Sequence, residues 1–198
     1  MQFKRKTLIL VIITLACWLG LGLAQAGEFS AQHVTRMDSQ ELRGKIYVQG
    51  DKIRQEFLTK EGGSINIARP DKKIVWLLMP DQKICVELPF SQKALEKTMQ
   101  MPKDRKDMKL LGTETVNGYE TEKYEVVEKE KGGMGKYYVW VAKKLDMPIK
   151  MASADGRFSS ELLNIKQGSV PPEVFEIPAG YRKMPMPRGM PPGKPQER

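Results

Sequence analysis

SINIARPDKKIVWLLMPDQKICVEL, residues 64–88, is the stretch that decides the fold. It contains three short apolar segments, separated by Arg69-Pro70-Asp71-Lys72 and by Pro80-Asp81. Proline and aspartate in such positions are typical of tight turns. Strands that are joined by so few residues pair antiparallel, because a parallel pair needs a long crossover. The stretch therefore predicts three consecutive antiparallel strands at 64–69, 73–79 and 82–88.

The middle segment, Ile74-Val75-Trp76-Leu77-Leu78-Met79, is apolar at every position. A strand with one solvated face alternates between apolar and polar residues, whereas a strand that is covered on both faces does not. The next segment, 83–88, does alternate. We therefore expect a sheet with one face on a core and with another element covering part of the other face.

Similar segments occur on both sides of this stretch. They are 29–38, 45–49 and 52–59 before it, and 109–115, 119–128, 136–142, 149–154 and 158–166 after it. Gly50-Asp51 and Asn117-Gly118, each between two of these segments, are hairpin signals. The sequence thus predicts a mainly β (α+β) domain of about 10–11 antiparallel strands, mostly connected as a meander.

One long helix is predicted at 90–101. Ser91 can cap its first turn with its hydroxyl group. Phe90 and Leu95 occupy the two positions of a hydrophobic staple, and Pro102 follows where the helix should end. This helix is the candidate for the element that covers part of the sheet.

The first 26 residues are expected to be a secretory signal peptide. Three cations, Lys4 to Lys6, precede an uncharged apolar run, and Ala24-Gln25-Ala26 forms the small-x-small pattern of a cleavage site. An uncleaved anchor is an alternative, but a run of about 17 residues is at the short limit for a spanning helix. A lipidated Cys17 is a further alternative, which the apolar residues beyond Cys17 disfavour. Cleavage after Ala26 predicts an exported, periplasmic protein.

The mature chain is expected to consist of one domain and a tail. A domain at 27–183 is long enough to bury a core. Pro171-Pro172 near its end can start a single helical turn through Phe175. Residues 184–198 are largely Pro, Met, Gly and charged residues, a composition that predicts a disordered tail.

Removal of the signal peptide lowers the formal charge from +9 to +6 and leaves Cys85 as the only cysteine. A single cysteine excludes an internal disulfide, and we expect Cys85 to pack as a small, half-buried strand residue. Intermolecular pairing or a reactive thiol is the alternative. Acidic and basic residues are interspersed, which argues against a nucleic-acid partner and is compatible with a transient contact with a membrane surface.

The residues that catalysis requires are not found together in this sequence. His33 is the only histidine, and its place in an alternating strand favours a structural or half-exposed role. One cysteine and one histidine cannot form an ordinary zinc site. The segment Gly132-Gly133-Met134-Gly135 lacks the lysine and the helix of a phosphate loop. We therefore predict no catalytic residues, no metal site, no cofactor and no enzymatic activity.

Eleven of the twelve methionines lie in the mature chain. Methionine is flexible and suits adaptable apolar surfaces, so these residues indicate either ordinary core packing or a soft cavity for an acyl chain. A third interpretation is copper binding by Met184, Met186 and Met190, because thioethers suit Cu(I). No histidine or cysteine near these three residues supports that interpretation.

In the order of its motifs, the chain resembles the LolA/LolB-like superfamily of periplasmic lipoprotein carriers. It resembles more closely an uncharacterised family of exported domains within or beside that superfamily. The residues that carry the resemblance are 44–48, 50–54, 69–76, 111–124, 140–142, 148–150 and 175–181. Together these motifs span about residues 28–183, nearly the whole mature domain.

The resemblance implies a curved antiparallel half-barrel with one or two helices over its concave face. In the carriers, the cavity between sheet and helices holds lipoprotein acyl chains. For this chain it implies a lipid or acylated protein as partner, bound in an apolar groove whose candidate lining residues are Trp76, Leu78, Met99, Trp140 and Met151. The alternative is a protein-interaction or envelope-sensing module without a ligand, whose apolar residues simply form the core.

Overall fold

The computed structural model describes residues 27–59, 62–90, 108–127 and 135–184. Their strands form one sheet of 12 strands in the order β12-β6-β5-β4-β3-β2-β1-β11-β10-β9-β8-β7. The strands are β1 (Phe29–Met37), β2 (Gln40–Gln49), β3 (Lys52–Thr59), β4 (Gly62–Arg69), β5 (Ile74–Met79), β6 (Ile84–Pro89), β7 (Lys109–Val116), β8 (Tyr119–Val127), β9 (Lys136–Ala142), β10 (Met147–Ser153), β11 (Phe158–Gln167) and β12 (Arg182–Met184). The predicted signal peptide lies outside the described residues, and so does the predicted tail at 184–198 apart from Met184, which ends β12.

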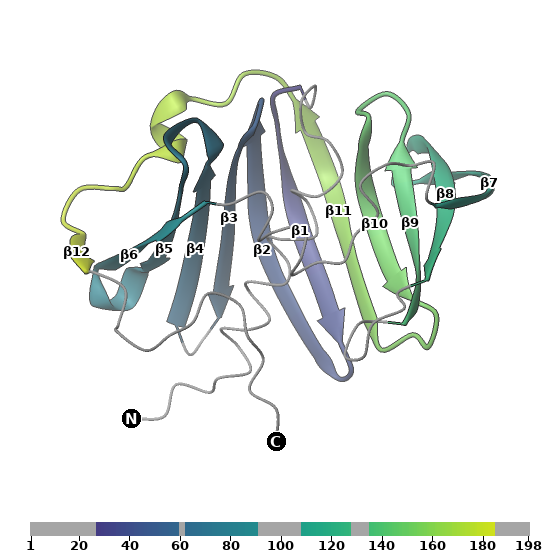
Figure 1. The fold of residues 1–198 in the computed structure, drawn as a ribbon, viewed down its shortest axis with the longest axis horizontal. Coiled ribbons are helices and arrows are strands. Elements are labelled where there is room, and N and C mark those ends of the chain that lie inside the picture. The colour runs from purple at the N-terminus through teal and green to yellow at the C-terminus, as the bar shows by residue number, and fades with distance from the viewer. Residues whose placement is uncertain (1–26, 60–61, 91–107, 128–134, 185–198) are drawn as a thin grey trace.

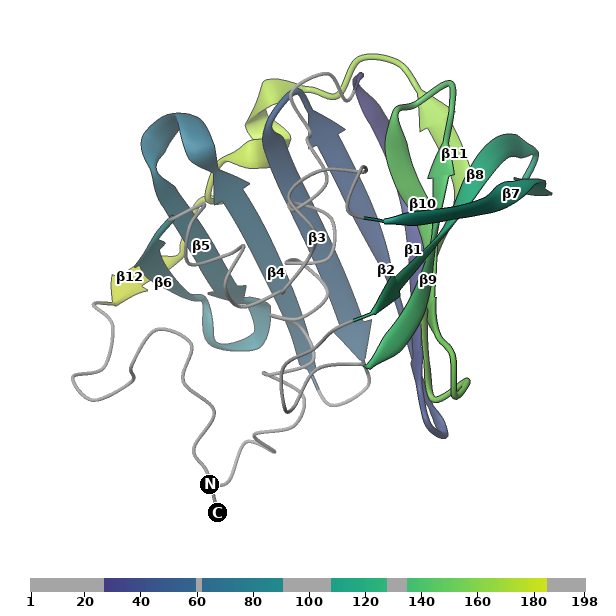
Figure 2. The same cartoon turned by 45° about the vertical axis from the view of Figure 1, so that its right-hand side comes forward.

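Two antiparallel meanders, β1 to β6 and β7 to β11, are joined side by side by the pairing of β1 with β11. The sheet is open, with β12 at one end of the row and β7 at the other (Figure 1). It is strongly curved, so that β7 and β8 come forward of the other strands and one face is concave (Figure 2). The predicted mainly β, curved and unclosed sheet is confirmed.

β12 is the exception to the expected antiparallel pattern. It pairs parallel with β6, with Lys183 opposite Cys85, and it had no counterpart among the predicted strands. A strand of three residues is too short to show an alternation of apolar and polar side chains. The long connection between β11 and β12 permits the parallel direction.

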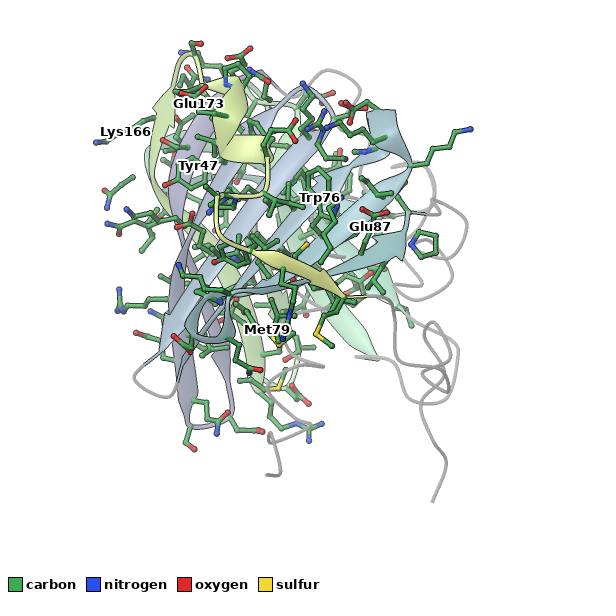
Figure 3. The ribbon with its side chains drawn as sticks, turned by 90° about the vertical axis from the view of Figure 1, so that its left-hand side faces the viewer. Tyr47, Trp76, Met79, Glu87, Lys166 and Glu173 are labelled. Carbon is green, nitrogen blue, oxygen red and sulfur yellow. The ribbon has the colours of Figure 1, made fainter. Side chains whose placement is uncertain are left out.

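The helices of the described residues are three short 3-10 turns: η2 (Pro70–Lys72), η3 (Pro80–Gln82) and η5 (Pro172–Phe175). The last one confirms the predicted helical turn, but it lies on the convex side of the sheet (Figure 3). Apart from Phe90, the predicted helix at 90–101 lies outside the described residues. One or two helices over the concave face are therefore not confirmed.

The two proline-aspartate turns around β5 have the same construction. Each begins with Pro-Asp in a 3-10 turn and ends with a lysine in the left-handed region, Lys73 at φ 56° and Lys83 at φ 51°. The backbone N–H of Lys73 donates to the Pro70 carbonyl oxygen at 3.0 Å, and that of Lys83 to Pro80 at 3.3 Å. These turns fix the register of β4, β5 and β6, and thereby decide which side chains of β5 share a face.

On the convex side, residues 169–184 cross β3, β4 and β5, and we call this segment the strap (Figure 3). Phe175 of the strap is fully buried. It packs in an apolar cluster with Val170 and with the convex side chains Ile65, Ile67, Trp76, Leu78 and Cys85. Cys85 is a free cysteine with no exposed surface, so it is more deeply buried than expected.

Two nearly buried arginines hold the strap against the sheet. Arg54 Nη1 donates to the Val174 carbonyl oxygen at 3.0 Å, and Arg69 Nη1 donates to the next carbonyl oxygen, that of Phe175, at 3.1 Å. Arg69 also makes a forked pair with Asp71, at 2.8 and 2.7 Å. This hydrogen bond lowers the pKa of the Asp71 carboxyl group. Both backbone carbonyl groups are thus satisfied beneath the strap.

The larger apolar cluster is centred on the concave side and extends to the ends of β8 to β11. It includes the buried side chains Phe29, Ile46, Val48, Ile53, Ala68, Tyr137, Val139, Ile149, Met151, Phe158 and Leu162. The sheet therefore has apolar side chains on both faces of β3 to β5, with the strap covering the convex one.

Candidate functional site

β5 explains why the sequence is apolar without alternation at 74–79. Trp76 and Leu78 point to the convex face, where they are 3% and 1% exposed in the cluster beneath the strap. Val75, Leu77 and Met79 have the opposite parity and therefore point to the concave face, where they are partly exposed. An additional element, the strap, covers the convex face of β5, whereas the helix at 90–101 that was the predicted cover lies, apart from Phe90, outside the described residues.

The partly exposed apolar surface continues from β5 onto β6. Register pairs Val75 with Leu88, Leu77 with Val86, and Met79 with Ile84. All three β6 partners are also partly exposed. We call the six residues Val75, Leu77, Met79, Ile84, Val86 and Leu88 the apolar strip. A contiguous apolar surface of this kind on a concave face is characteristic of a site for an apolar ligand.

β4 lies between the apolar strip and β3, and it presents smaller side chains to the concave face. Ser64, Asn66 and Ala68 stand there in register with Phe57, Gln55 and Ile53 of β3. On the other side, Asn66 and Ala68 face Leu77 and Val75. The row of small side chains is therefore flanked by a row of larger ones on each side.

A row of buried polar groups crosses this apolar face. Its members are Asn66, Gln55, His33, Thr35 and Ser160, each at most 1% exposed. His33 Nε2 lies 2.7 Å from Ser160 Oγ and 3.2 Å from Thr35 Oγ1. Gln55 Nε2 lies 3.2 Å from His33 Nδ1. The two ring nitrogens of neutral His33 supply one donor and one acceptor to these contacts.

Gly44 permits the close contact between two of the rings on this face. Register places Gly44 between His33 on β1 and Phe57 on β3, and the ring centroids of His33 and Phe57 are 5.3 Å apart. A Cβ atom at Gly44 would lie 1.9 Å from the Glu56 carbonyl oxygen. Only glycine fits this position.

His33 is neutral at physiological pH. Burial lowers its pKa to about 3, because the imidazolium form loses its hydration. A general acid or base works best with a pKa near the operating pH, so His33 instead orients the polar row. Within the described ranges, no group of three or more His, Cys, Asp and Glu side chains could hold a metal ion.

The structure separates the residues that the sequence suggested as a groove lining. Trp76 and Leu78 lie under the strap on the convex face, whereas Met151 lies on the concave face of β10, opposite Val139 and Ser160. Met99 lies outside the described residues. The described candidates are therefore not brought together, and of these only Met151 faces the concave side.

Trp140 also lies on the convex face, far along the sheet from the strap. Its Nε1 donates to the Glu114 carboxylate, a bond that lowers the pKa of Glu114. The ammonium groups of Lys123 and Lys150 lie 4.8 and 4.9 Å from the ring centroid. Trp140 is thus covered by long charged side chains on a solvated face.

Neither the apolar strip nor the polar row could be recognised from local sequence patterns. Both alternating sets of side chains in 74–79 are apolar. Only the pairing with β4 and β6 therefore reveals which set points to the concave face. The burial of Asn66 was not signalled either: Ile65-Asn66-Ile67 alternates as a strand with one solvated face does, whereas the structure leaves Asn66 only 1% exposed.

Two depressions that are open to solvent lie away from the apolar strip. One, of about 490 Å³, is lined at the start of β1 and the end of β11 by residues that include Phe29, Leu145 and Gly168. The other, of about 750 Å³, lies between the β7–β8 and β9–β10 turns and includes Tyr119 and Lys143. Across the described residues, no helix has the length and apolar character needed to span a membrane.

Solved structures with this fold come from several proteins. An uncharacterized conserved protein from Thermus thermophilus is 14% identical, and the match covers 92% of this chain and 100% of that one with a TM-score of 0.62. MucB of Pseudomonas aeruginosa, solved in complex with MucA, is 11% identical, with 78% of this chain and 56% of that chain covered and a TM-score of 0.51. At identities this low, the two structural matches show a likeness of fold alone.

A LolA superfamily protein from Nitrosomonas europaea also matches, with 14% identity, coverage of 83% of this chain and 97% of that one, and a TM-score of 0.37. No curated protein matches the sequence. A family model does match, over residues 31–147, and the predicted resemblance to a family of unknown function is confirmed. Because this match covers more than half of the chain, the protein belongs to the family described as Domain of unknown function (DUF4412).

Proposed function

We propose that this protein is a carrier-like binding protein of the cell envelope, which holds an acyl chain of a lipid or of a lipidated protein against the apolar strip. The observation that carries the proposal is the two-sided apolar character of β5. The strap covers the convex side chains, whereas Val75, Leu77 and Met79 remain partly exposed on the concave side. An acyl chain is the ligand whose shape and polarity suit such a surface.

The proposal places the protein outside the cytoplasm, with residues 1–26 removed as a signal peptide and residues 27–183 acting as the binding domain. It is a proposal for binding and not for catalysis. The neutral, buried His33 and the polar row support this choice, because such groups can orient a ligand without exchanging protons with it.

The test is mass spectrometry of solvent extracts from the protein purified out of a bacterial periplasm. Wild-type protein is expected to carry acyl lipid, and Leu77→Ser is expected to carry much less, because the substitution places a hydroxyl group in the apolar strip. Leu110→Ser is the matched control, since Leu110 is 54% exposed on β7, at the opposite end of the strand order from β5 and β6. Equal lipid in the two variants, or none in the wild type, would contradict the proposal.

A protein partner is the second candidate, and β7 is the observation that favours it. β7 exposes Leu110 and Leu111, and among the described strands it pairs only with β8. The unpaired backbone groups of an edge strand can accept an extended peptide. MucB, which shares the fold, was solved together with MucA. A photo-crosslinking amino acid in place of Leu111 is expected to trap such a partner in the envelope, and absence of any adduct would count against it.

A further inference from the structure

Asn66 is buried with an amide group that has no hydrogen-bond partner among the described residues. Its side chain is 1% exposed, and Nδ2 finds no acceptor in that part of the chain. Nearly all buried polar groups in proteins are paired, because an unpaired donor has lost its hydration without compensation. An unpaired donor in the middle of a sheet therefore calls for an acceptor from outside the described residues, and a bound ligand can supply one.

The position of Asn66 indicates where that acceptor would lie. Asn66 points to the concave face, between Gln55 of the polar row and Leu77 of the apolar strip. Its neighbours on the same face of β4 are the small residues Ser64 and Ala68. A ligand lying along the strip would thus bring its own atoms next to the amide group.

We infer that Asn66 donates a hydrogen bond to the carbonyl oxygen of an ester- or amide-linked acyl chain that lies on the apolar strip. The inference rests on the proposed function and deepens it by naming the ligand class. An acyl carbonyl group is an uncharged acceptor attached to a hydrocarbon chain, and it matches one donor beside an apolar surface. Hydrocarbon alone would leave the amide unpaired.

The same geometry selects against a free fatty acid. A buried carboxylate needs a cation or several donors. Among the described residues, the buried arginines are Arg54 and Arg69, and both belong to the opposite face, where they donate to carbonyl oxygens of the strap. The ligand class is therefore a neutral acyl ester or amide, as occurs in a glycerolipid or in an acylated protein terminus.

Three probes of equal chain length test the inference in the mature protein: methyl dodecanoate, N-methyldodecanamide and dodecyl methyl ether. The ether keeps the chain but lacks the carbonyl group. The ester or the amide is expected to bind about tenfold more tightly than the ether. The stronger of the two indicates the source, since an ester corresponds to a glycerolipid and an amide to an acylated protein.

The variant Asn66→Leu is expected to bind all three probes equally, whereas Ser64→Ala, the matched control on the same face of β4, should keep the preference. If Asn66→Leu fails to fold, Asn66→Asp serves instead, because its carboxylate accepts and cannot donate to a carbonyl group. Equal binding of ester, amide and ether by the wild type would overturn this inference and leave the proposed function standing. Absence of binding by all three would overturn the proposed function itself.

Discussion

The guanidinium of Arg69 donates from Nη1 to the carbonyl oxygen of Phe175 at 3.1 Å, although 106 positions separate the two residues in the chain. This hydrogen bond joins the last part of the domain to β4 at the point where the Phe175 ring is fully buried. The strap thereby seals the convex side of β5, and the concave side retains the partly exposed apolar surface on which the proposed function depends.

Truncation of the strap's main apolar contact should destabilise the whole domain. Phe175→Ala is expected to lower the free energy of unfolding by about 3–5 kcal/mol, because it empties a fully buried site. Glu173→Ala, in the same 3-10 turn but exposed, should change it by less than about 0.5 kcal/mol. Urea denaturation of both variants measures the difference, and equal stabilities would show that the strap does not contribute to the core.

Loss of the Arg69 guanidinium should loosen the strap without unfolding the sheet. Arg69→Met keeps the length of the side chain but leaves the Phe175 carbonyl oxygen without its donor, at a cost of about 1–3 kcal/mol. The stability of Arg69→Lys should lie between that of the wild type and that of Arg69→Met, because one ammonium group cannot reproduce the forked pair with Asp71. Amide hydrogen exchange is expected to accelerate in residues 170–182 and to stay unchanged in β9 and β10; uniform acceleration would contradict this prediction.

Stability should fall in mild acid because of His33. The pKa of His33 is lowered from 6.5 to about 3 by burial, so below pH 6.5 the unfolded chain binds a proton that the folded chain does not. The contribution of the neutral His33 imidazole to the free energy of unfolding is fully present above pH 6.5. It is lost as the pH falls toward 3, at about 1.4 kcal/mol per pH unit.

The matched variant is His33→Gln, which has no group that titrates in this window. Since His33 is the only histidine in the chain, the difference in unfolding free energy between the two proteins at pH 7 and at pH 5 isolates its effect. The wild type should lose more stability than the variant. A difference that does not change with pH would mean that the folded protein binds this proton normally.

Cys85 should be unreactive as long as the domain is folded. It has no exposed surface, and burial raises the pKa of its thiol, which lowers the fraction of reactive thiolate. In the mature protein, a thiol-specific reagent such as dithionitrobenzoate should label Cys85 only in denaturant. Rapid labelling under native conditions would contradict the packing of β6 beneath the strap.

Much of the fold could be predicted from the sequence, because hairpins depend on local signals. All eleven strands of the two meanders were anticipated, and the paired Pro-Asp turns around β5 placed three of them in order. β12 was missed, since Arg182 to Met184 pair with β6 only through contacts that are distant in sequence.

The candidate site was harder to predict than the fold. Trp76 and Leu77 are adjacent and equally apolar, yet one lies under the strap and the other on the concave face. The choice depends on register with β4 and on where the strap crosses the sheet, which no local pattern contains. In the sequence, their size and apolarity make Trp76 and Trp140 candidate lining residues of the site. In the structure, the candidates are instead Leu77 and its smaller neighbours in the apolar strip.

The most direct test of the proposed site is photo-crosslinking with a lipid whose acyl chain carries a diazirine group, followed by mapping of the modified residues. Adducts are expected on the apolar strip, at Val75, Leu77 and Val86, and these adducts should be lost when unlabelled lipid competes. Adducts concentrated on exposed apolar residues such as Leu110 and Leu111, or no adduct that competitor removes, would contradict the assignment of the apolar strip as an acyl-chain site.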